Sequence, residues 1–233
     1  QDTNIYHLNG IKIDEATSKS DSYDASNQLL AGYFGLNVPF LKRFNIYTGV
    51  RAEKNIRVLH GADVSKSITI NRDTLNFFPS VNMSYNLSQR VLIRLAYGMT
   101  INRPEFREIA PFVFYNFEER WTIYGESRLK DAYIHNYDAR LEWYPNPTEM
   151  ISFGGFYKKF NNPIEATLIN AGTGWNFKYQ NAIGAQSYGV EADIRKSLAA
   201  LGDMDNPLRF FKDFSVILNA SLIQSQIKLD TSI

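Results

Sequence analysis

Few residues in this chain have the types and spacing that catalysis or metal binding needs, and the histidines are the first to consider. The three histidines, His7, His60 and His135, are far apart, and no two of them stand at the spacing of a metal site. His135 falls on the apolar row of a predicted strand, near its rim, which favours an interfacial side chain over a ligand. The chain has no cysteine, so disulfides, thiolate zinc sites and cysteine nucleophiles are excluded. We expect neither a metal nor a cofactor.

The paired carboxylates are weak candidates for catalysis. Glu118 and Glu119 lie in a charged stretch that is typical of a solvated loop. Glu191 and Asp193 stand beside Arg195 on a row that should face a polar interior, where ion pairing with neighbouring strands is the simpler role. A glycosidase would need two carboxylates that converge across a cleft. We therefore predict no catalytic residue and no enzyme.

Aromatic and basic residues in the polar stretches are better suited to binding. Tyr115, Trp121 and Trp175 could stack on the flat ring of a small ligand such as a sugar, although a girdle or packing role is equally open to them. Arg103 and Arg107 could contact a ligand at a loop rim. These residues form the candidate ligand-binding set. The net charge of +1 gives no reason to expect nucleic acid as a partner.

The elements that must position these residues are β-strands, because alternation of period two runs through most of the chain. It is clearest over residues 75–104, which predict a β-hairpin turning at 86–89. On the second strand the apolar row comprises Val91, Ile93, Leu95, Tyr97, Met99 and Ile101, and the opposite row comprises Leu92, Arg94, Ala96, Gly98, Thr100 and Asn102. The matching polar row of the first strand contains Ser80, Asn82, Ser84 and Asn86. Because these residues and Arg94 cannot fill a dry core, the polar rows should face a water-filled or plugged lumen. The apolar row would then meet lipid or a second sheet.

Strand length helps to distinguish a membrane barrel from a soluble sheet. About eleven residues at ~3.3 Å each give ~36 Å, and a tilt near ~40° projects this to ~27 Å, close to the apolar band of an outer-membrane barrel. Strands in soluble sheets usually stop at about five or six residues. A helical membrane span is excluded, because the chain has no run of about eighteen apolar residues.

The rest of the chain predicts further strands of the same kind, about eight in all. Strands are expected over 28–38, 44–53, 75–86, 91–102, 133–144, 150–161, 177–196 and 214–222. Residues 1–27 and 57–76 are predicted as polar loops, the second with room for a local hairpin, and 103–132 is the longest connection. Apart from a longer turn near Gly202, short and long connections alternate, which is typical of periplasmic turns and extracellular loops.

Aromatic residues make up 14% of the chain and gather where the girdles of a barrel should lie. Near the short turns these are Phe40, Phe44, Tyr85, Trp143 and Tyr144, and towards the long loops they are Tyr133 and Tyr137.

Three stretches resemble the barrel domain of TonB-dependent outer-membrane receptors, particularly those of Bacteroidota. They are FFPSVNMSYNLSQRVLIRLAYGMTINRPEFREIAPF, EWYPNPTEMISFGGFYKKFNNPIE and QSYGVEADIRKSL, and the resemblance extends over roughly residues 26–229. For residues 103–108 it favours a structural role in folding the loop back on the barrel. The sequence departs from the family at Gly125–Asp131, so that loop could take another path.

The resemblance also implies that residues 1–233 are only part of a barrel. The family has a barrel of roughly twenty-two strands around an N-terminal plug, and the chain carries neither a plug nor the usual closing strand. We expect a fragment from the C-terminal half of an antiparallel, up-and-down transmembrane barrel.

The function implied by the resemblance is active import across the outer membrane of a Gram-negative bacterium. The nutrient would be a ferric siderophore, cobalamin or an oligosaccharide, and TonB would supply energy through the absent plug. Outer-membrane lipid, the small nutrient and a surface lipoprotein would be the partners.

Two alternatives come from other classes of protein. A complete small barrel of about eight strands could act as an adhesin or a structural protein, although its narrow interior would be underfilled by the small residues of the polar rows. A soluble β-sandwich binding module would instead bury the apolar rows between two sheets.

Overall fold

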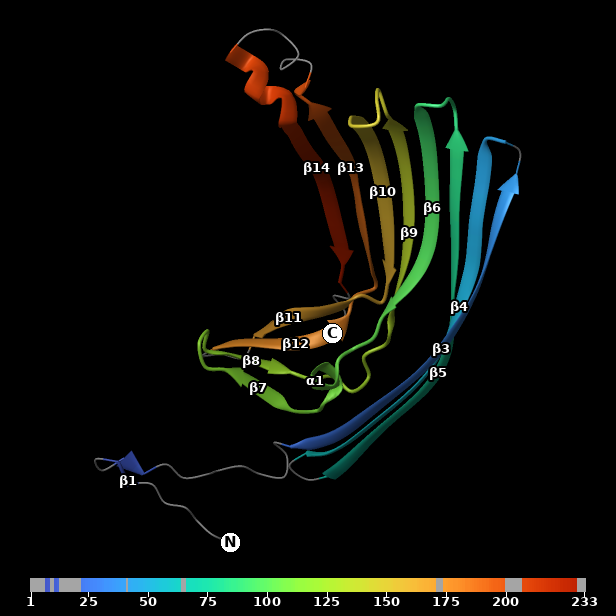
Figure 1. Ribbon diagram of the computed structural model, residues 1–233. Coiled ribbons are helices and arrows are strands. Elements are labelled where there is room, and N and C mark those ends of the chain that lie inside the picture. Colours follow the sequence, from blue (N-terminus) through green and yellow to red (C-terminus); the bar gives the residue numbers. More distant parts are fainter. Residues whose placement is uncertain are drawn as a thin grey trace.

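The main body of the protein is one long, strongly curved antiparallel sheet (Figure 1). The computed structural model describes residues 7–8, 11–12, 22–40, 42–63, 66–170, 174–199 and 207–229. The eight strands of the main sheet are β3 (Tyr23–Phe40), β4 (Phe44–Asp63), β5 (Lys66–Asn86), β6 (Val91–Asn102), β9 (Ala132–Trp143), β10 (Met150–Asn161), β13 (Gly184–Ser197) and β14 (Ser215–Lys228). Their order across the sheet follows their order in the chain, and all neighbours are antiparallel. The predicted all-β, up-and-down architecture is confirmed.

Smaller elements lie outside this sheet. A separate two-stranded sheet pairs β1 (His7–Leu8) with β2 (Ile11–Lys12), and a 3-10 helix, η2 (Pro207–Asp213), precedes β14. Most of the predicted loop 1–27 lies outside the described residues, but β3 already begins at Tyr23. Within the described part of the chain, no helix is both long and apolar enough to cross a membrane.

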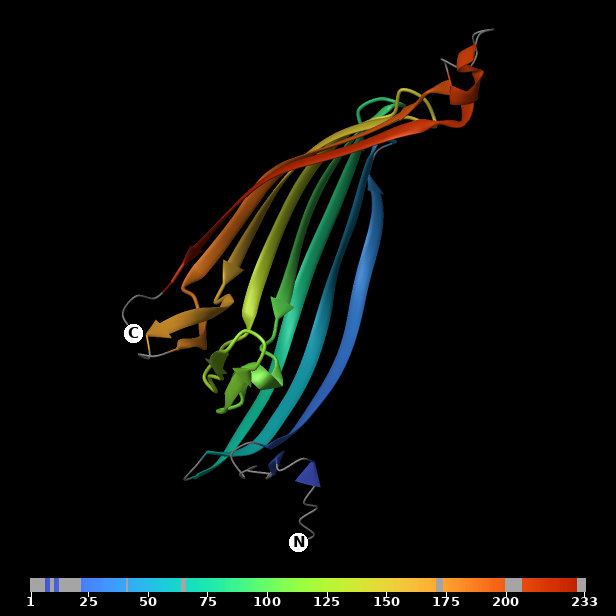
Figure 2. The same ribbon diagram turned by 90° about the vertical axis from the view of Figure 1, so that its left-hand side faces the viewer.

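The connections fall at two ends of the sheet (Figure 2). The β3–β4, β5–β6, β9–β10 and β13–β14 connections lie at one end, here called the short-turn end, and the β4–β5, β6–β9 and β10–β13 connections lie at the opposite loop end. Because long extracellular loops and short periplasmic turns mark outer-membrane barrels, the loop end should be extracellular.

Two sequence predictions about this end are wrong. Residues 57–76 are no loop, because β4 continues to Asp63 and β5 begins at Lys66. The alternation is hidden there because Arg57 and Leu59, one charged and one apolar, share a buried row at 6% and 0% exposure. The predicted strand 177–196 is divided between β12 (Trp175–Asn181), which belongs to another sheet, and β13.

The two faces of the sheet can be assigned from one contact. Leu59 packs against loop segments on the concave side, so its row of β4 is concave. Strand pairing carries this assignment across the sheet through the direct partners Gly49 and Ser80, then Ser80 and Gly98. Arg94 and Ala96 are therefore concave, and Leu95 is convex, as the sequence predicts.

The convex face is apolar and open over the half of the sheet near the short turns. On β3 its large side chains are Phe40, Val38, Leu36, Phe34 and Leu30, with Phe34 at 65% and Leu30 at 76% exposure. This run covers about ten residue steps, or ~25 Å at a tilt near ~40°. It ends at an ion pair between Lys54 and Asp73 on the convex rows of β4 and β5. The apolar band thus has the height of a membrane core.

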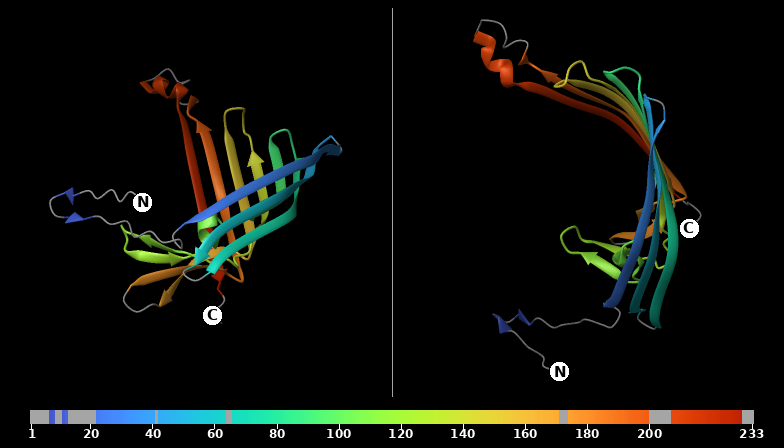
Figure 3. Two further views of the ribbon diagram at one scale, coloured as in Figure 1. Left: turned by 90° about the horizontal axis from the view of Figure 1, so that it is seen from below. Right: turned by 45° about the vertical axis from the view of Figure 1, so that its right-hand side comes forward.

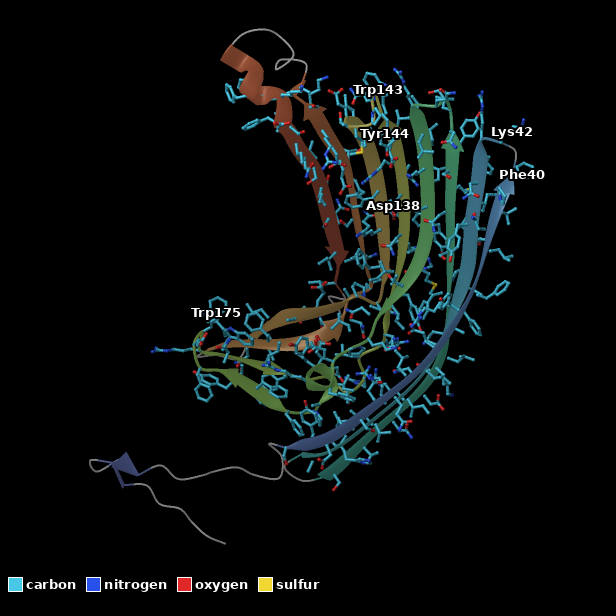
Figure 4. The ribbon with its side chains drawn as sticks, viewed as in Figure 1. Phe40, Lys42, Asp138, Trp143, Tyr144 and Trp175 are labelled. Atoms are coloured by element: carbon cyan, nitrogen blue, oxygen red, sulfur yellow. The ribbon has the colours of Figure 1, made fainter. Side chains whose placement is uncertain are left out.

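Aromatic side chains mark the short-turn edge of this band (Figure 4). Phe44 lies between Phe40 and Tyr85, with ring centroids 6.3 and 6.4 Å away. Figure 4 shows Trp143 and Tyr144 near the same end. Phe40, Phe44, Tyr85 and Trp143 are on convex rows, as the predicted girdle requires. Tyr144 departs from it, because its hydroxyl donates to Glu142 on the concave row at 2.7 Å.

Tyr133 departs from its predicted place in the opposite girdle. Its hydroxyl donates to Asn76 on the concave row of β5, at 2.6 Å. This contact is available because pairing between β5 and β6 ends at Ser80 and Gly98, which leaves β5 accessible to the end of β9.

Arginine substitutions at Leu95 and Ala96 test the assignment of faces. Leu95 lies on the convex face near the middle of the band, where an arginine costs about 2–4 kcal/mol. Ala96 is the direct partner of Asp138, so an arginine there gains a cross-strand carboxylate and should cost much less. We expect Leu95→Arg to deplete heat-resistant, assembled barrel from outer-membrane fractions and Ala96→Arg to leave it nearly unchanged. Equal losses, or a greater loss for Ala96→Arg, would contradict the assignment.

Candidate functional site

The two longest connections fold together into a second, four-stranded sheet on the concave side (Figures 1 and 2). The β6–β9 connection contains α1 (Phe106–Ile109), β7 (Val113–Asn116) and β8 (Trp121–Tyr124). The β10–β13 connection contains β11 (Ile164–Asn170) and β12. The strand order is β11-β12-β8-β7, with β8 and β12 parallel and the other pairs antiparallel. We call this the loop sheet.

A small hydrophobic core attaches the loop sheet to the eight-stranded main sheet, here called the wall. Leu59 from β4 packs with residues of the β6–β9 connection, and all of them are buried: Ile109, Ala110, Phe112 and Leu129. Ile70 from β5 and Phe114, Ile164 and Tyr179 from the loop sheet pack around this cluster. Both connections therefore share one core with the extended part of β4 and β5.

Two arginines of the wall, the buried Arg57 and the half-buried Arg72, add polar contacts to this attachment. The Arg57 guanidinium donates to the carbonyl of Pro104, and Arg72 donates to the carbonyl of Ser127 at 2.8 Å. Glu53, which is 8% exposed, accepts from Arg51 at 2.7 Å and from Arg103 at 2.8 Å. A buried carboxylate needs such partners, because a buried charge without them is strongly destabilising.

Gly125 allows the backbone to pass close to the segment after α1. A Cβ atom at this position would lie 1.8 Å from the Ala110 carbonyl oxygen. The neighbouring amides are satisfied, because the Gly125 N–H donates to Phe112 at 3.1 Å and the Glu126 N–H donates to Glu108 at 2.7 Å. Only glycine fits this crossing.

Glu126 joins the two connections electrostatically. Its carboxylate accepts from Arg128 at 3.1 Å and from the Lys178 ammonium of β12 at 2.9 Å. The hydrogen bonds from Arg128, together with those from Lys178, lower the pKa of Glu126 to about 2 despite the opposing effect of burial.

Aromatic side chains occupy one face of the loop sheet at its free end. Trp121 and Trp175 are direct partners in the parallel pairing of β8 with β12. Phe177 shares their face, and its ring centroid lies 5.4 Å from that of Trp121. Trp175 is 64% exposed and stands at the tip of the sheet in Figure 4. We call Trp121, Trp175 and Phe177 the aromatic face.

Tyr115 lies on the opposite face. Its direct partner is Thr122, the neighbour of Trp121, so Tyr115 and Trp121 point to different sides. Tyr115 packs edge-on against Phe117 at 4.8 Å. The predicted aromatic set is thus divided between two faces, and Phe177 joins one of them without any local sequence signal.

The two arginines of the predicted set also have different environments. Arg103 is bonded to Glu53 and its side chain is 18% exposed. Arg107 is exposed, and its guanidinium lies over the Phe114 ring at 4.8 Å. Arg107 is the one of these two that a ligand could reach without breaking an ion pair.

Charged side chains line the concave face nearer the short turns. Arg94 contacts Glu142 at 3.0 Å, and Arg140 contacts Glu191 at 3.6 Å, beside a groove of about 350 Å³. Asp193 accepts from Ser152 at 3.0 Å. Glu191 and Asp193 thus lie on the polar face with partners on neighbouring strands, as predicted. Among the described residues, no three His, Asp or Glu side chains are placed to hold a metal.

Gly125→Ala should unfold the attachment of the loop sheet without affecting the wall. The added methyl group would overlap a backbone carbonyl, which cannot move aside as a flexible side chain could. We expect faster hydrogen exchange over residues 104–130 and unchanged exchange in β9. Gly174→Ala is the matched control, because nothing lies within 4 Å of its Cβ position. Unchanged exchange in Gly125→Ala would contradict the observed crossing.

The loop sheet should also loosen in acid. Because the folded-state pKa of Glu126 lies below the ordinary value of 4.5, its stabilising effect is complete above pH 4.5 and is lost as the pH falls through about 2. Hydrogen exchange over residues 121–130, corrected for the intrinsic rate at each pH, should accelerate in that interval. Glu126→Gln should exchange faster at pH 6 and lose this acid dependence. An identical pH profile in both proteins would refute the assignment.

Comparisons with known proteins agree with this architecture. Residues 1–231 match the model of the outer membrane protein beta-barrel family. Among solved structures, the siderophore receptor PirA from Pseudomonas aeruginosa is similar with a TM-score of 0.57 and 16% identity over 88% of this chain and 44% of that chain. The alcaligin outer membrane receptor FauA from Bordetella pertussis is similar with a TM-score of 0.56 and 11% identity over 89% of this chain and 32% of that chain. The copper transporter OprC is similar with a TM-score of 0.59 and 13% identity over 74% of this chain and 26% of that chain.

These likenesses concern the fold, because all three identities are far below 25%. The chain spans less than half the length of each of these solved proteins. A search of curated proteins gave no match. These comparisons place the chain in the outer membrane of a Gram-negative bacterium, where the open apolar convex face meets lipid. The alternative of a soluble β-sandwich is therefore wrong. With the match over residues 1–231, the chain belongs to the outer membrane protein beta-barrel family.

Proposed function

We propose that this chain forms part of the wall and the capture loops of a larger barrel that imports a scarce nutrient. The observation that carries this proposal is the loop sheet on the concave side (Figure 3). The interior of an eight-stranded barrel is only wide enough for side chains, whereas here a whole four-stranded sheet occupies the space inside the curve. This favours a wide barrel over the complete small barrel.

The open edges of the wall support the same proposal. β3 and β14 are the two ends of the eight-stranded sheet, and in the described residues they are not paired with each other. An unpaired edge inside a bilayer leaves backbone groups unsatisfied at a cost of several kcal/mol each. Further strands of a complete barrel would pair with both edges. A plug inside that barrel would face the charged concave groove beside Arg94 and Arg140.

The aromatic face is the proposed contact for the nutrient. Two indoles and a phenyl ring present flat apolar surfaces that stack on a catechol-type siderophore ring, the corrin of cobalamin or a sugar ring. Arg107 could supply a positive charge for an anionic ligand, while Arg103 serves as an anchor for the loop through Glu53. TonB, acting through the plug, would drive release, and a surface lipoprotein would assist capture.

Alanine substitutions on the two faces of the loop sheet test this proposal. Growth of a gene-deletion strain on single iron, cobalamin and glycan sources identifies the nutrient, and its binding to the purified full-length protein is then measured. Removing two stacking contacts of about 0.5–1.5 kcal/mol each predicts that Trp121→Ala/Trp175→Ala weakens binding by about 5–150-fold.

Tyr115→Ala serves as the matched control, because it removes an exposed aromatic ring from the opposite face. We expect a change of less than about 3-fold for this variant. Equal effects of the two sets, or unchanged uptake of every nutrient in the deletion strain, would count against the proposal.

A further inference from the structure

Four tyrosines form a ladder across the convex face. Tyr97, Tyr137, Tyr157 and Tyr188 are direct partners in consecutive strand pairs of β6, β9, β10 and β13. The centroid of Tyr137 lies 5.1 Å from that of Tyr97 and 6.1 Å from that of Tyr157. They stand at one height in the sheet, near the extracellular edge of the apolar band on these strands.

An apolar groove of about 920 Å³ lies on the short-turn side of this ladder. It is hollowed because two small convex residues, Ala139 and Gly155, are direct partners on β9 and β10. Larger neighbours stand on both sides, with Leu95 beside Ala139 and Val190 beside Gly155. The groove volume is within the range of ligand sites in proteins.

A polar depression of about 390 Å³ continues beyond Tyr157 towards the loop end. Lys159 and Lys228 both line it. Tyr157 donates to Gln186 at 3.3 Å, and Gln186 donates to Gln226 at 2.9 Å. The two hollows share Tyr157, so an apolar groove leads directly into a polar, cationic one.

In the part of the chain that the structure describes, the positive charge of this depression has no acidic partner. Within the described residues, no ion pair involves Lys159 or Lys228. The acidic residues of β9 and β13 are all on concave rows, and β10 and β14 contain none. His135, the direct partner of Lys159, shares a hydrogen bond of 3.1 Å with Tyr97. A phosphate would find the ammonium groups of Lys159 and Lys228 and several neutral donors here.

We propose that this double hollow binds one phosphorylated lipid of the outer leaflet, which in a Gram-negative outer membrane is lipopolysaccharide. An acyl chain fills the groove over Ala139 and Gly155, and the phosphate of its lipid A lies between Lys159 and Lys228. The direction fits, because the polar hollow is on the extracellular side, where the headgroups of that leaflet lie. Burial of the acyl chain and pairing of the phosphate with the two lysines would both stabilise the bound lipid.

Groove-filling and charge-removing variants test the two parts of the site separately. Gly155→Leu fills the groove with an apolar side chain, and its Cβ position has only an ordinary contact of 3.6 Å, with the Gly189 oxygen. Lys159→Gln/Lys228→Gln removes the charges without altering the groove. The controls are Gly32→Leu, at a convex glycine with nothing within 4 Å of its Cβ position, and Lys54→Gln, at a convex lysine outside the hollows.

Binding is measured by native mass spectrometry of the full-length protein in detergent with purified monophosphoryl lipid A. We expect one tightly held lipid in the unaltered protein and in both controls, and at least tenfold weaker binding in both test variants. Dephosphorylated lipid A and phosphatidylethanolamine should also bind at least tenfold more weakly.

Equal binding by test and control variants, or by phosphorylated and dephosphorylated lipid A, would overturn the proposal. So would displacement of the lipid by a second protein chain on this face. Heat-modified electrophoretic migration verifies that each variant assembles. If Gly155→Leu does not assemble, lipid binding by Lys159→Gln/Lys228→Gln still tests the proposal. Nutrient uptake is a separate measurement that this result does not depend on.

Discussion

Backbone amides within a bilayer must find their hydrogen bonds inside the protein, and the rest of the structure depends on this requirement. It favours long strands in unbroken antiparallel pairing. Alternate side chains of such strands face lipid on the convex side, where they must be apolar, and the interior on the concave side, where they can carry charge. The described strands meet this requirement between β3 and β14, where each strand of the wall pairs with its neighbours in chain order, while the outer edges of β3 and β14 are open. Polar function is thereby confined to the concave side and to the loop end.

The loop sheet shows how the concave side uses this freedom. A sheet built from connections has little hydrophobic core of its own, since its free end is exposed, and Leu59 and Ile70 of the wall complete that core. Arg57 and Arg72 then donate to the carbonyls of Pro104, which is buried, and of Ser127, which is half-buried. The extension of β4 and β5 beyond the membrane band is therefore a platform that holds the connections over the interior.

The sequence predicts the wall better than the site for a physical reason. The alternation at Leu95 and Ala96 arises because one face of the strand meets lipid and the other meets the polar interior. Strands, faces and the turns at the short-turn end therefore follow from the local sequence pattern. At Arg57 and Leu59 both residue types are buried by the β6–β9 connection, which removes the contrast and makes this part of β4 resemble a loop in sequence. The pairing of Trp121 with Trp175 joins segments more than fifty residues apart, and no local pattern encodes it. Tyr115 could be separated from them only once that pairing was known.

Two consecutive glycines on β10 lie on opposite faces of the sheet, one towards the polar interior and one towards lipid. Gly154 lies in the concave charged groove, with its Cβ position 3.6 Å from the Arg140 guanidinium, whereas Gly155 forms the floor of the convex apolar groove. A shift of one residue in the pairing of β10 would exchange these positions, turning Phe153 to the concave face and Lys158 to the lipid-facing one. The same register that keeps Lys158 of β10 on the concave side therefore opens the groove on the convex side. Polar interior and lipid-facing surface are set by a single alignment of strands, and neither could be altered alone.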